Sequence, residues 1–300
     1  MKKMVVAVIV TYNRKSLLEK SIAAILAQSV AIEKMIVVDN NSSDGTEDYV
    51  KLLRNDNINI EYYNTGANLG GAGGFHAGFK IAEKYDYSHL WIMDDDFIPQ
   101  KDCLEVMLSY QHIGIIQPLR FNLDGTCAEL SPVKYDLSTP YLINPKRTKV
   151  VDFYENDTMP DSLQISGVPF EGPLISREVI NSIGYPNPDY FIFNDDLDYS
   201  LRARKYGYEI ICLKYARGTR LLTNNQNNDL SSWKGYFMLR NLFHIHYAYG
   251  ENIFVKYKPV ILVLGYALKC IFAGNFSSLK TVANAYFDSF ALKNNEKHKP

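Results

Sequence analysis

Two clusters of aspartates carry the clearest chemical signal in this sequence. The first, formed by Asp94, Asp95 and Asp96, directly follows an apolar run in the segment "HLWIMDDDFIPQ". Three adjacent carboxylates repel one another and are costly to remove from water, so a simple turn is the weaker explanation. Carboxylate oxygens suit Mg²⁺ or Mn²⁺, which usually keep waters and share the phosphates of a substrate. The first cluster therefore predicts a divalent-cation site at the end of a buried strand.

The second cluster, formed by Asp195, Asp196 and Asp198, opens the segment "NDDLDYSLRARKYG". Acidic residues come first and basic residues last, as the helix macrodipole favours, so the segment predicts a helix. Capping of that helix would explain the acids by itself. A carboxylate at a helix N-terminus is also rigidly placed, which suits a general base. The two interpretations are compatible.

Strand-like and helix-like patterns alternate through the first 121 residues. Apolar runs predict strands at 4–10, 34–40, 58–63, 88–96 and 113–121, and helical patterns predict helices at 15–28, 43–55, 73–85 and 100–110. This alternation predicts an α/β fold with a mostly parallel sheet flanked by helices. Ligands of such sheets bind at the carboxyl ends of the strands.

Polar residues follow four of these predicted strands. They are Thr11, Tyr12 and Asn13, then Asp39, Asn40 and Asn41, then Asn64, and finally the aspartates of the first cluster. Each group alone would fit an ordinary turn. Because the carboxyl ends of parallel strands meet at one edge of the sheet, the four groups together predict one site.

The glycine-rich segment "NLGGAGGFHAG" follows the third predicted strand. It is a poor match to the dinucleotide-binding fingerprint, because His76 stands where G-x-G-x-x-G needs its last glycine. Glycines before a helix still allow a ligand to approach the backbone closely, and the helix N-terminus favours an anion. A tight loop that packs on the sheet is the alternative.

The chain is less regular beyond residue 121. Residues 120–165 predict a long excursion packed over the site, and residues 231–300 predict a mainly helical region behind a catalytic domain of residues 1–230. The apolar run "PVILVLGYALKCIFAG" is shorter than the ~20 residues of a bilayer span and contains Lys269. It predicts either a core helix or a helix on a membrane surface.

The composition limits the classes of function. The 300 residues carry a formal net charge of −1, which argues against a general nucleic-acid-binding protein. The four cysteines form no C-x-x-C pair and predict free thiols in a reducing compartment. The apolar N-terminus is short and no cleavage site follows it, so it predicts a buried strand in a cytoplasmic protein instead of a signal peptide.

Five segments resemble the motifs of family 2 glycosyltransferases, the inverting enzymes of the GT-A fold. They are "VIVTYNR", "IVVDNNSSDGT", "NLGGAGGF", "WIMDDD" and "FNDDLDYSLRARKYGY", in the order of that family and spread over residues 4–245. The glycine-rich segment and the three aspartates most resemble the bacterial galactofuranosyltransferases and rhamnosyltransferases. The resemblance implies a Rossmann-like GT-A sheet.

The resemblance also implies a role for each matching residue. The nucleotide-sugar donor would contact Thr11, Tyr12, Asn13, Asp39, Asn41, Asn68, Gly70, Gly71, Asp94, Asp95 and Arg220. Asp94 and Asp96 would hold Mg²⁺ or Mn²⁺, like the family's DxD motif, and the cation would neutralise the leaving diphosphate. Asp196 would be the catalytic base, with Asp195 beside the acceptor.

One departure from the family concerns the metal site. In related transferases a histidine often follows the base and completes this site, whereas "LKYARGTRLLTNN" contains none. Arg217 or Arg220 would then contact the diphosphate directly. His244 and His246 are alternative metal ligands, although a histidine in an aromatic helix is more often a packed core residue.

The segment "SSWKGYFMLRNLFHIHYAYG" is rich in aromatic residues. Trp233 and Tyr236 are candidates for contact with a sugar acceptor, because aromatic faces pack on the C–H surfaces of sugars. Packing in the core or against a second subunit explains them equally well. With Lys256, Lys258 and Lys269, the region is also a candidate surface for peripheral membrane association.

The sequence therefore predicts an inverting, metal-dependent glycosyltransferase at the inner face of the cell membrane. The resemblance favours UDP-galactofuranose as donor, with dTDP-rhamnose as the alternative, and a glycan or lipid-linked acceptor in cell-surface polysaccharide synthesis. A non-catalytic nucleotide-sugar-binding module fits two intact acidic clusters less well. A nucleotidyltransferase would need a glycine-rich loop after the first strand, and "TYNRKS" lacks one. Assembly as a homo-oligomer stays open.

Overall fold

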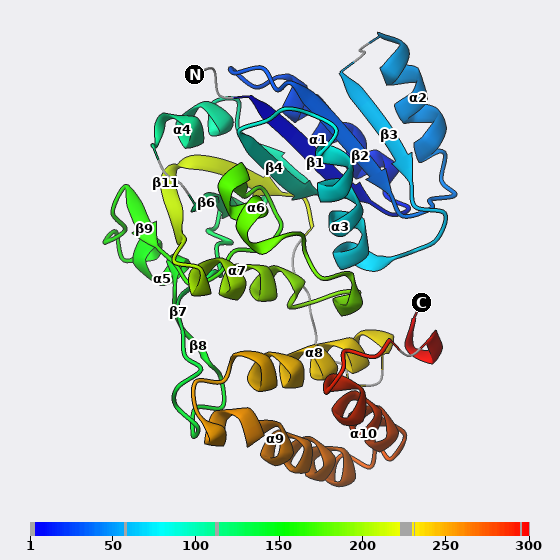
Figure 1. Cartoon of the computed structure of the whole chain (residues 1–300), viewed down its shortest axis with the longest axis vertical. Helices are drawn as coiled ribbons and strands as arrows, with labels where there is room; N and C mark the ends of the chain where they lie inside the picture. Colours follow the sequence, from blue (N-terminus) through cyan, green and yellow to red (C-terminus); the bar gives the residue numbers. More distant parts are fainter. Residues whose placement is uncertain are drawn as a thin grey trace.

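The computed structural model describes residues 4–56, 59–111, 114–222, 230, 232–294 and 296–299 of the chain. A central β-sheet carries helices on both faces, and three C-terminal helices form a further layer (Figure 1). The expected α/β fold with a mostly parallel sheet and a helical C-terminal region is confirmed. The domain boundary at residue 230 stays a prediction.

The central sheet contains nine strands within the described residues. In spatial order they are β3 (Ile60–Asn64), β2 (Lys34–Asp39), β1 (Val5–Thr11), β4 (His89–Asp94), β10 (Leu174–Ser176), β6 (Gly114–Phe121), β11 (Glu209–Arg220) and β5 (Phe97–Pro99), with β9 (Ser162–Gln164) also paired to β11. The first four are parallel to one another, and so are β6 and β11. Strands β10, β5 and β9 run antiparallel to their neighbours.

The core lies on both sides of the parallel strands, which explains their continuous apolar runs. One face packs against α3 (Gly70–Ala82), α6 (Arg177–Ile183) and α7 (Asp195–Lys205), and the other against α1 (Lys15–Leu26), α2 (Thr46–Asp56) and α4 (Cys103–Ser109). Val6 and Val8 of β1 belong to the first face, whereas Val5 and Ala7 belong to the second.

Helix α3 begins at Gly70, three residues before the predicted start at Gly73, so the glycines lie inside its first turns. A Cβ atom on Gly74 would lie 2.5 Å from Val10 of β1, and one on Gly78 would lie 2.4 Å from Val8. These two glycines therefore let the helix pack closely on the strand. The prediction of a glycine loop that leads into the helix was wrong in its boundary, because close packing extends the helix backwards.

The excursion at residues 120–165 contains a two-stranded sheet of β7 (Pro132–Tyr135) and β8 (Lys146–Lys149), then α5 (Val150–Glu155) and β9. Hydrogen bonds tie it to the C-terminal helices and to the turn between α8 and α9, where the Glu251 amide donates to the carbonyl oxygen of Leu137 at 2.9 Å. Asn252 Nδ2 donates to the carbonyl oxygen of Ser138 at 2.6 Å, and Lys258 Nζ donates to that of Leu142. The excursion thus bridges the sheet and the helical layer.

The C-terminal layer consists of α8 (Trp233–Tyr249), α9 (Ile253–Phe272) and α10 (Ser277–Ser289). Helix α8 lies beneath α7, and α9 lies farther from the sheet (Figure 1). Within the described residues, no helix is both long and apolar enough to span a bilayer. The four cysteines are unpaired, as predicted.

Candidate active site

Strand register brings the predicted polar residues to one edge of the sheet. Thr11 pairs with Asp39, and Asp39 pairs with Asn64 on the next strand. On the other side of β1, Val10 pairs with Asp94. The carboxyl ends of the four parallel strands therefore meet, as the sequence predicted, and the first acidic cluster begins there.

The central aspartate of the first cluster, Asp95, ties β4 to the end of β1. Thr11 Oγ1 donates a hydrogen bond of 2.8 Å to its carboxylate, and the guanidinium of Arg14 forms an ion pair with it at 3.3 Å. Burial raises the pKa of Asp95, although Arg14 and Thr11 oppose this shift. The side chain is almost fully buried, so its interactions position the cluster.

The flanking aspartates carry charge that the protein does not fully compensate. Burial raises the pKa of Asp94 well above its ordinary value, and the charges of Asp96 and Glu171 raise it further. Burial and Glu171 raise the pKa of Asp96 to about 6. A divalent cation would relieve this repulsion, so the two carboxylates fit the metal that the family resemblance implies. Among the described residues, no group of three or more His, Cys, Asp or Glu side chains could hold a metal ion. Besides one or two carboxylates, such a cation usually takes water molecules and substrate phosphate oxygens as ligands.

A chain of alternating charges runs from the first cluster into the molecule. Glu171 forms ion pairs with Arg120 and with Arg220, whose Nε lies 2.6 Å from Glu171 Oε2 without forming an aligned hydrogen bond. Arg120 in turn donates to Glu129 at 2.8 and 3.0 Å. Burial of ions is tolerated because each faces an opposite charge. Arg220, and not Arg217, is the arginine beside the first cluster, because the charge of Arg220 acts on Asp96.

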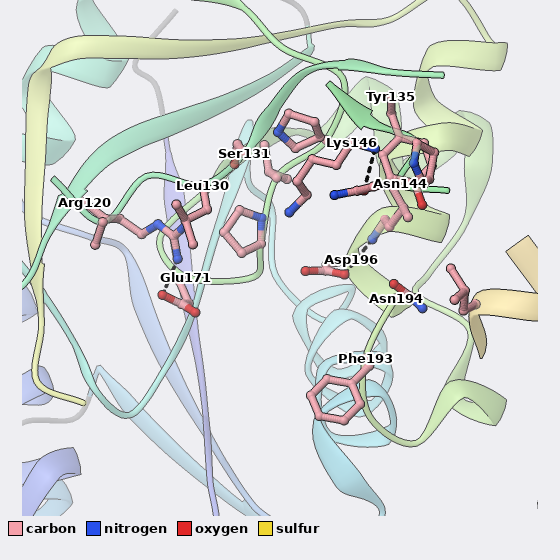
Figure 2. Close-up of a pocket in the computed structure, with 18 of the residues that line it drawn as sticks. Arg120, Leu130, Ser131, Tyr135, Asn144, Lys146, Glu171, Phe193, Asn194 and Asp196 are labelled. Atoms are coloured by element: carbon pink, nitrogen blue, oxygen red, sulfur yellow. Dashed lines mark hydrogen bonds and ion pairs between the residues drawn. The ribbon is translucent and has the colours of Figure 1, made fainter. Parts of the chain in front are cut away.

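A cavity of about 400 Å³ connects this charge chain to the second cluster. Its wall includes Arg220 and Glu171 at one end and Asp196 at the other, with Tyr135 and Lys146 supplied by the excursion. Figure 2 shows Lys146 and Asp196 projecting into the space, with the Arg120–Glu171 pair beyond them. The excursion therefore supplies part of the wall of this cavity, and its placement over the active site stays a prediction.

Asp196, the predicted general base, is the acid of the second cluster that faces the cavity. It is partly exposed and lines the cavity, whereas its neighbour Asp195 is buried and does not. Burial raises the pKa of Asp196, while a hydrogen bond from the Leu197 amide and the charge of Lys146 lower it. A raised pKa makes a carboxylate a better proton acceptor, provided that it remains ionised at the working pH.

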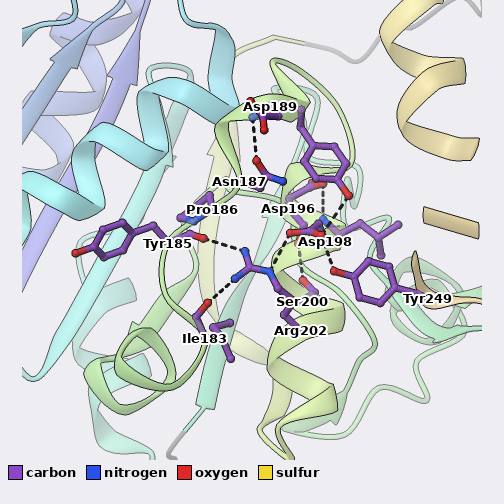
Figure 3. A network of polar contacts seen from close by, with 12 residues as sticks. Ile183, Tyr185, Pro186, Asn187, Asp189, Asp196, Asp198, Ser200, Arg202 and Tyr249 are labelled. Atoms are coloured by element: carbon purple, nitrogen blue, oxygen red, sulfur yellow. Dashed lines mark hydrogen bonds and ion pairs between the residues drawn. The ribbon is translucent and has the colours of Figure 1, made fainter. Parts of the chain in front are cut away.

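Asp198, the third acid of the second cluster, holds α7 in place. Its carboxylate accepts hydrogen bonds from Tyr190 at 3.1 Å and Tyr249 at 2.5 Å, and it pairs with Arg202 one turn later at 3.0 Å. Arg202 also donates to the carbonyl oxygen of Ile183 at the end of α6. Figure 3 shows this network around the N-terminal turn of α7. The carboxylate of Asp198 therefore has a structural role, because three side chains already bind it.

The loop that leads into the second cluster is strained. Phe191, Phe193 and Asn194 all have positive φ values, between 61° and 68°. A non-glycine residue in such a conformation costs about 1–3 kcal/mol. The carbonyl oxygen of Phe191 accepts a hydrogen bond from Ala72, and it lies so near Gly70 that a Cβ there would be 2.1 Å away. The glycine segment thus touches the loop that carries the base.

Helix α8 holds this strained loop from the other side. Asn241 Nδ2 donates to the carbonyl oxygens of Tyr190, Ile192 and Phe193 at 2.7–3.1 Å. Its neighbour Arg240 donates to that of Asp189 at 2.7 Å. The side chains of Arg240 and Asn241 are both fully buried. The Arg240–Asn241 pair therefore compensates the loop's buried carbonyls and fixes the entry to α7.

Several of the predicted donor-binding residues already have hydrogen-bond partners within the protein. Asp39 accepts hydrogen bonds from the Ser42 amide at 2.8 Å and the Tyr62 hydroxyl at 2.7 Å. Asn13 and Asn41 adopt positive φ, and Asn68 accepts a hydrogen bond from the Gly70 amide at 3.0 Å.

Two donor-side residues are more open. Tyr12 is 41% exposed, and a Cβ on Gly71 would meet no protein atom within 4 Å. The binding roles given to the donor-side residues stay predictions.

Several candidates from the aromatic segment lie away from the cavity. Tyr236 is fully buried and donates to Asp288 at 2.7 Å, so it packs in the helical core. His244 Nδ1 lies 2.8 Å from the Ser289 carbonyl oxygen, and His246 Nδ1 lies 2.8 Å from that of Leu242. Burial lowers the pKa of both histidines. Both histidines therefore pack among the helices, which is the alternative that the sequence left open. Arg217 is not part of this segment, and its guanidinium lies over the ring of Phe121.

Trp233 is the aromatic candidate that lies nearest the site. Its ring packs edge-on against Phe191, the first strained residue of the base loop, with ring centroids 6.1 Å apart. It remains partly exposed at the start of α8. A contact with the acceptor therefore stays a prediction for Trp233.

Sequence reasoning missed Glu171, Lys146 and the Arg240–Asn241 pair. Glu171 follows "GVPF" in a segment whose change of pattern gave no chemical signal. Lys146 lies in the irregular excursion, where no periodicity ranks one residue above another. The sequence did offer one signal for the pair on α8, which is a charged and an amide side chain within an otherwise apolar stretch of helix.

The known proteins that this chain resembles are glycosyltransferases. Residues 6–114 match the family described as glycosyl transferase family 2. The chain is 27% identical over 209 residues to galactofuranosyltransferase GlfT1 of Mycolicibacterium smegmatis, a match that covers 68% of this chain and 67% of that protein. It is 23% identical over 246 residues to the low-salt glycan biosynthesis hexosyltransferase Agl10 of Haloferax volcanii, covering 78% and 73%.

Among solved structures, the fold resembles the mannosyltransferase PcManGT from Pyrobaculum calidifontis in complex with GDP-Man and Mn²⁺. The TM-score is 0.58 at 17% sequence identity, over 98% of this chain and 77% of that one. At this identity the likeness concerns the fold. It agrees with the GT-A architecture expected from the sequence.

Proposed function

We propose that the chain is a family 2 glycosyltransferase and that it transfers galactofuranose from UDP-galactofuranose to a hydroxyl group of a glycan or lipid-linked acceptor. The observation that carries the proposal is the cavity lined by Asp196 of the second cluster and by Glu171 and Arg220, whose charges act on Asp96 of the first cluster. Inverting transfer needs one charge centre for the leaving diphosphate and another for the attacking hydroxyl. The galactofuranosyltransferase relatives support the choice of donor.

In the proposed reaction, Asp196 accepts the proton of the acceptor hydroxyl as its oxygen attacks the anomeric carbon. The bond from that carbon to the diphosphate breaks on the opposite face, so the anomeric configuration inverts. Partial burial supports this role, because it makes the carboxylate more basic. Lys146 lies near the base and opposes protonation of its carboxylate before the acceptor binds.

The nucleoside diphosphate lies at the other end of the cavity in this proposal. Asp94 and Asp96 would hold Mg²⁺ or Mn²⁺, and the cation would neutralise charge on the leaving diphosphate. Arg220 provides a fixed positive charge beside Asp96, where the family more often has histidine. Thr11, Asp39 and the glycines at the start of α3 surround the nucleoside and its phosphates.

We place this reaction at the inner face of the cell membrane, in the synthesis of a cell-surface glycan. The names of the relatives support a role in glycan assembly.

A donor-by-acceptor transfer assay tests the function. UDP-galactofuranose and dTDP-rhamnose are each incubated with the protein, Mn²⁺ and a set of short glycan acceptors, and NMR identifies the product. The proposal predicts a galactofuranosyl product of inverted configuration, with little product in the presence of a chelator. A rhamnosyl product alone would reject the donor, and product of retained configuration would reject the mechanism.

A further inference from the structure

A second cavity of about 430 Å³ lies between α7, the α8–α9 turn and the excursion. Arg204 and Lys205 come from the last turn of α7, and Lys256 comes from the first turns of α9. We call this cavity the basic groove. Its other polar walls include Tyr249, whose hydroxyl bonds Asp198 in the second acidic cluster. The groove therefore adjoins the helix that carries the proposed base.

The charge of the basic groove is not balanced by nearby acids. Within the described part of the chain, Arg204, Lys205 and Lys256 have no ion pair with a carboxylate, and Glu251 is the one acidic residue in the lining. The C-terminus of α7 accounts for two of these cations through the helix dipole. It does not account for Lys256, which a different helix brings to the same cavity. Three converging cations suit a phosphate or diphosphate.

The basic groove shares one lining residue with the cavity of the proposed base. Tyr135 lines both spaces, and the charge of Asp196 acts on its hydroxyl. A ligand whose anionic part occupied the groove would therefore direct its neighbouring sugar past Tyr135 toward Asp196.

Helix α9 presents a broad apolar surface beside the groove. Six of its side chains are 61–86% exposed, and we call them the α9 apolar face: Ile253, Phe254, Tyr257, Ile261, Leu264 and Phe272. In an ideal helix they span an arc of about 100°. The opposite side of α9 packs against α8 and α10 through Val255 and Cys270, so the helix is apolar on both sides.

The charges around this face have one sign. Residues 252–287 contain four lysines and no acidic residue. On the ideal helix, Lys256 and Lys269 each fall about 60° beyond the two edges of the apolar arc. This arrangement is typical of helices that lie in a bilayer surface, where lysines at the edges reach anionic headgroups.

We propose that the basic groove binds the phosphate or diphosphate that links the acceptor glycan to a lipid carrier, while the α9 apolar face lies in the membrane surface. Lys256 lines the basic groove and also flanks the α9 apolar face, so the lipid would leave the groove directly into the bilayer. The proposal rests on the proposed transferase function and specifies its acceptor class. It explains why exposed apolar and basic residues gather beside the cavity that holds the base.

A comparison of two acceptors tests the groove. Both carry the same glycan, linked either to a polyprenyl diphosphate or to an uncharged octyl chain. We expect the double variant R204Q/K256Q to lower the ratio of kcat/KM for the first acceptor to that for the second at least tenfold. The matched control is K20Q/K80Q, which removes two exposed lysines from α1 and α3. An unchanged ratio in the groove variant would overturn the proposal.

Vesicle flotation tests the same proposal without catalysis. Phosphatidylcholine vesicles with polyprenyl phosphate should carry the wild-type protein upward more strongly than vesicles without it. The groove variant should lose this difference, and I261S/L264S should lose flotation with both vesicles. Flotation of both variants like the wild type would overturn the proposal.

Two further outcomes separate the alternatives. If the wild type transfers sugar to neither acceptor, the proposed function fails, and flotation still decides the groove. Analytical ultracentrifugation without vesicles examines a second copy as the occupant of the α9 apolar face. A wild-type dimer that I261S/L264S dissociates would overturn the membrane assignment.

Discussion

The charge of Glu171 acts on both acidic clusters, but different contacts hold each cluster in place. Asp94, Asp95 and Asp96 follow a buried strand, and the pairing of β4 with β1 fixes their place. The proposed base, Asp196, follows a loop with three strained residues, and side chains of α8 hold that loop. The first cluster is placed by regular backbone pairing, whereas the second depends on contacts with a distant part of the chain.

This difference indicates how the enzyme divides its work. A metal and diphosphate site needs carboxylates at a fixed spacing, which a strand end supplies with few supporting contacts. A base must reach a proton with sub-ångström accuracy, so it needs additional support. Substitutions in the supporting side chains should therefore affect the base cluster and spare the donor cluster.

The largest effect is expected when the base loses its charge. Asp196→Asn keeps the shape of the side chain but cannot accept the hydroxyl proton, so transfer should fall by about 10³-fold. Initial rates with donor and acceptor at saturation measure this loss. Asp189→Asn, an exposed aspartate before the strained loop, is the control and should behave like the wild type. Unimpaired transfer by Asp196→Asn would remove Asp196 from the mechanism.

On the donor side, Asp94→Asn should weaken the metal site. We expect transfer to fall by about 10²-fold, because the leaving diphosphate loses much of its neutralisation. Titration with Mn²⁺ measures the effect, and the half-saturating concentration should rise at least tenfold. Addition of a chelator to the wild type should give a comparable loss that excess Mn²⁺ reverses. Transfer that is insensitive to a chelator would contradict the metal role.

A smaller effect is expected from the residues that hold the base loop. Asn241→Leu removes the side-chain donor from the carbonyl oxygens of Ile192 and Phe193, whereas that of Tyr190 keeps its bond from Arg240. The loss of these two bonds should lower the unfolding free energy by about 2–4 kcal/mol. The kcat should fall about tenfold, while the Kd for donor stays near the wild-type value, since the first cluster is held independently. Asn284→Leu on α10 is the matched control. An equal loss in donor binding would show that the two clusters are not held separately.

The smallest effect concerns the stability of the metal-free protein. The pKa of Asp96 is raised from 3.8 to about 6. Between about pH 4 and pH 6 the folded protein therefore keeps the proton on this carboxylate, whereas the unfolded chain has released it. This carboxylate therefore lowers stability as pH rises from about 4 through 6. Asp96→Asn should increase the unfolding free energy by about 1–3 kcal/mol at pH 8 and leave it nearly unchanged at pH 4. Urea unfolding with a chelator, at both pH values, measures this difference. A stabilisation of the same size at both pH values would reject the shift.

The sequence predicted the donor side of the site more completely than the base side. Apolar runs that end in polar residues define both the strands and their carboxyl ends, so Asp39 and Asp94 could be placed without coordinates. The base helix was also predicted, because its charge order follows the macrodipole. Its supports were not, because the bond from Asn241 to Phe193 joins residues 48 apart and depends on how two helices pack.

The aromatic segment shows the same limit. Tyr236 and Trp233 are close in sequence and chemically alike, yet the first lies in the helical core and the second lies against the base loop. The weak periodicity of an aromatic helix could not separate them. Likewise, Glu171 gains its importance from two arginines on β6 and β11, which only the folded sheet brings together.

Donor affinity and single-turnover transfer, measured side by side in Asp94→Asn and Asp196→Asn, test the central claim most directly. Calorimetry with UDP-galactofuranose and Mn²⁺ gives the affinity, and rapid quench gives the rate. The account predicts that Asp94→Asn loses affinity, whereas Asp196→Asn binds donor like the wild type and loses turnover. If both variants lose affinity to the same extent, the clusters do not divide the leaving group and the nucleophile between them.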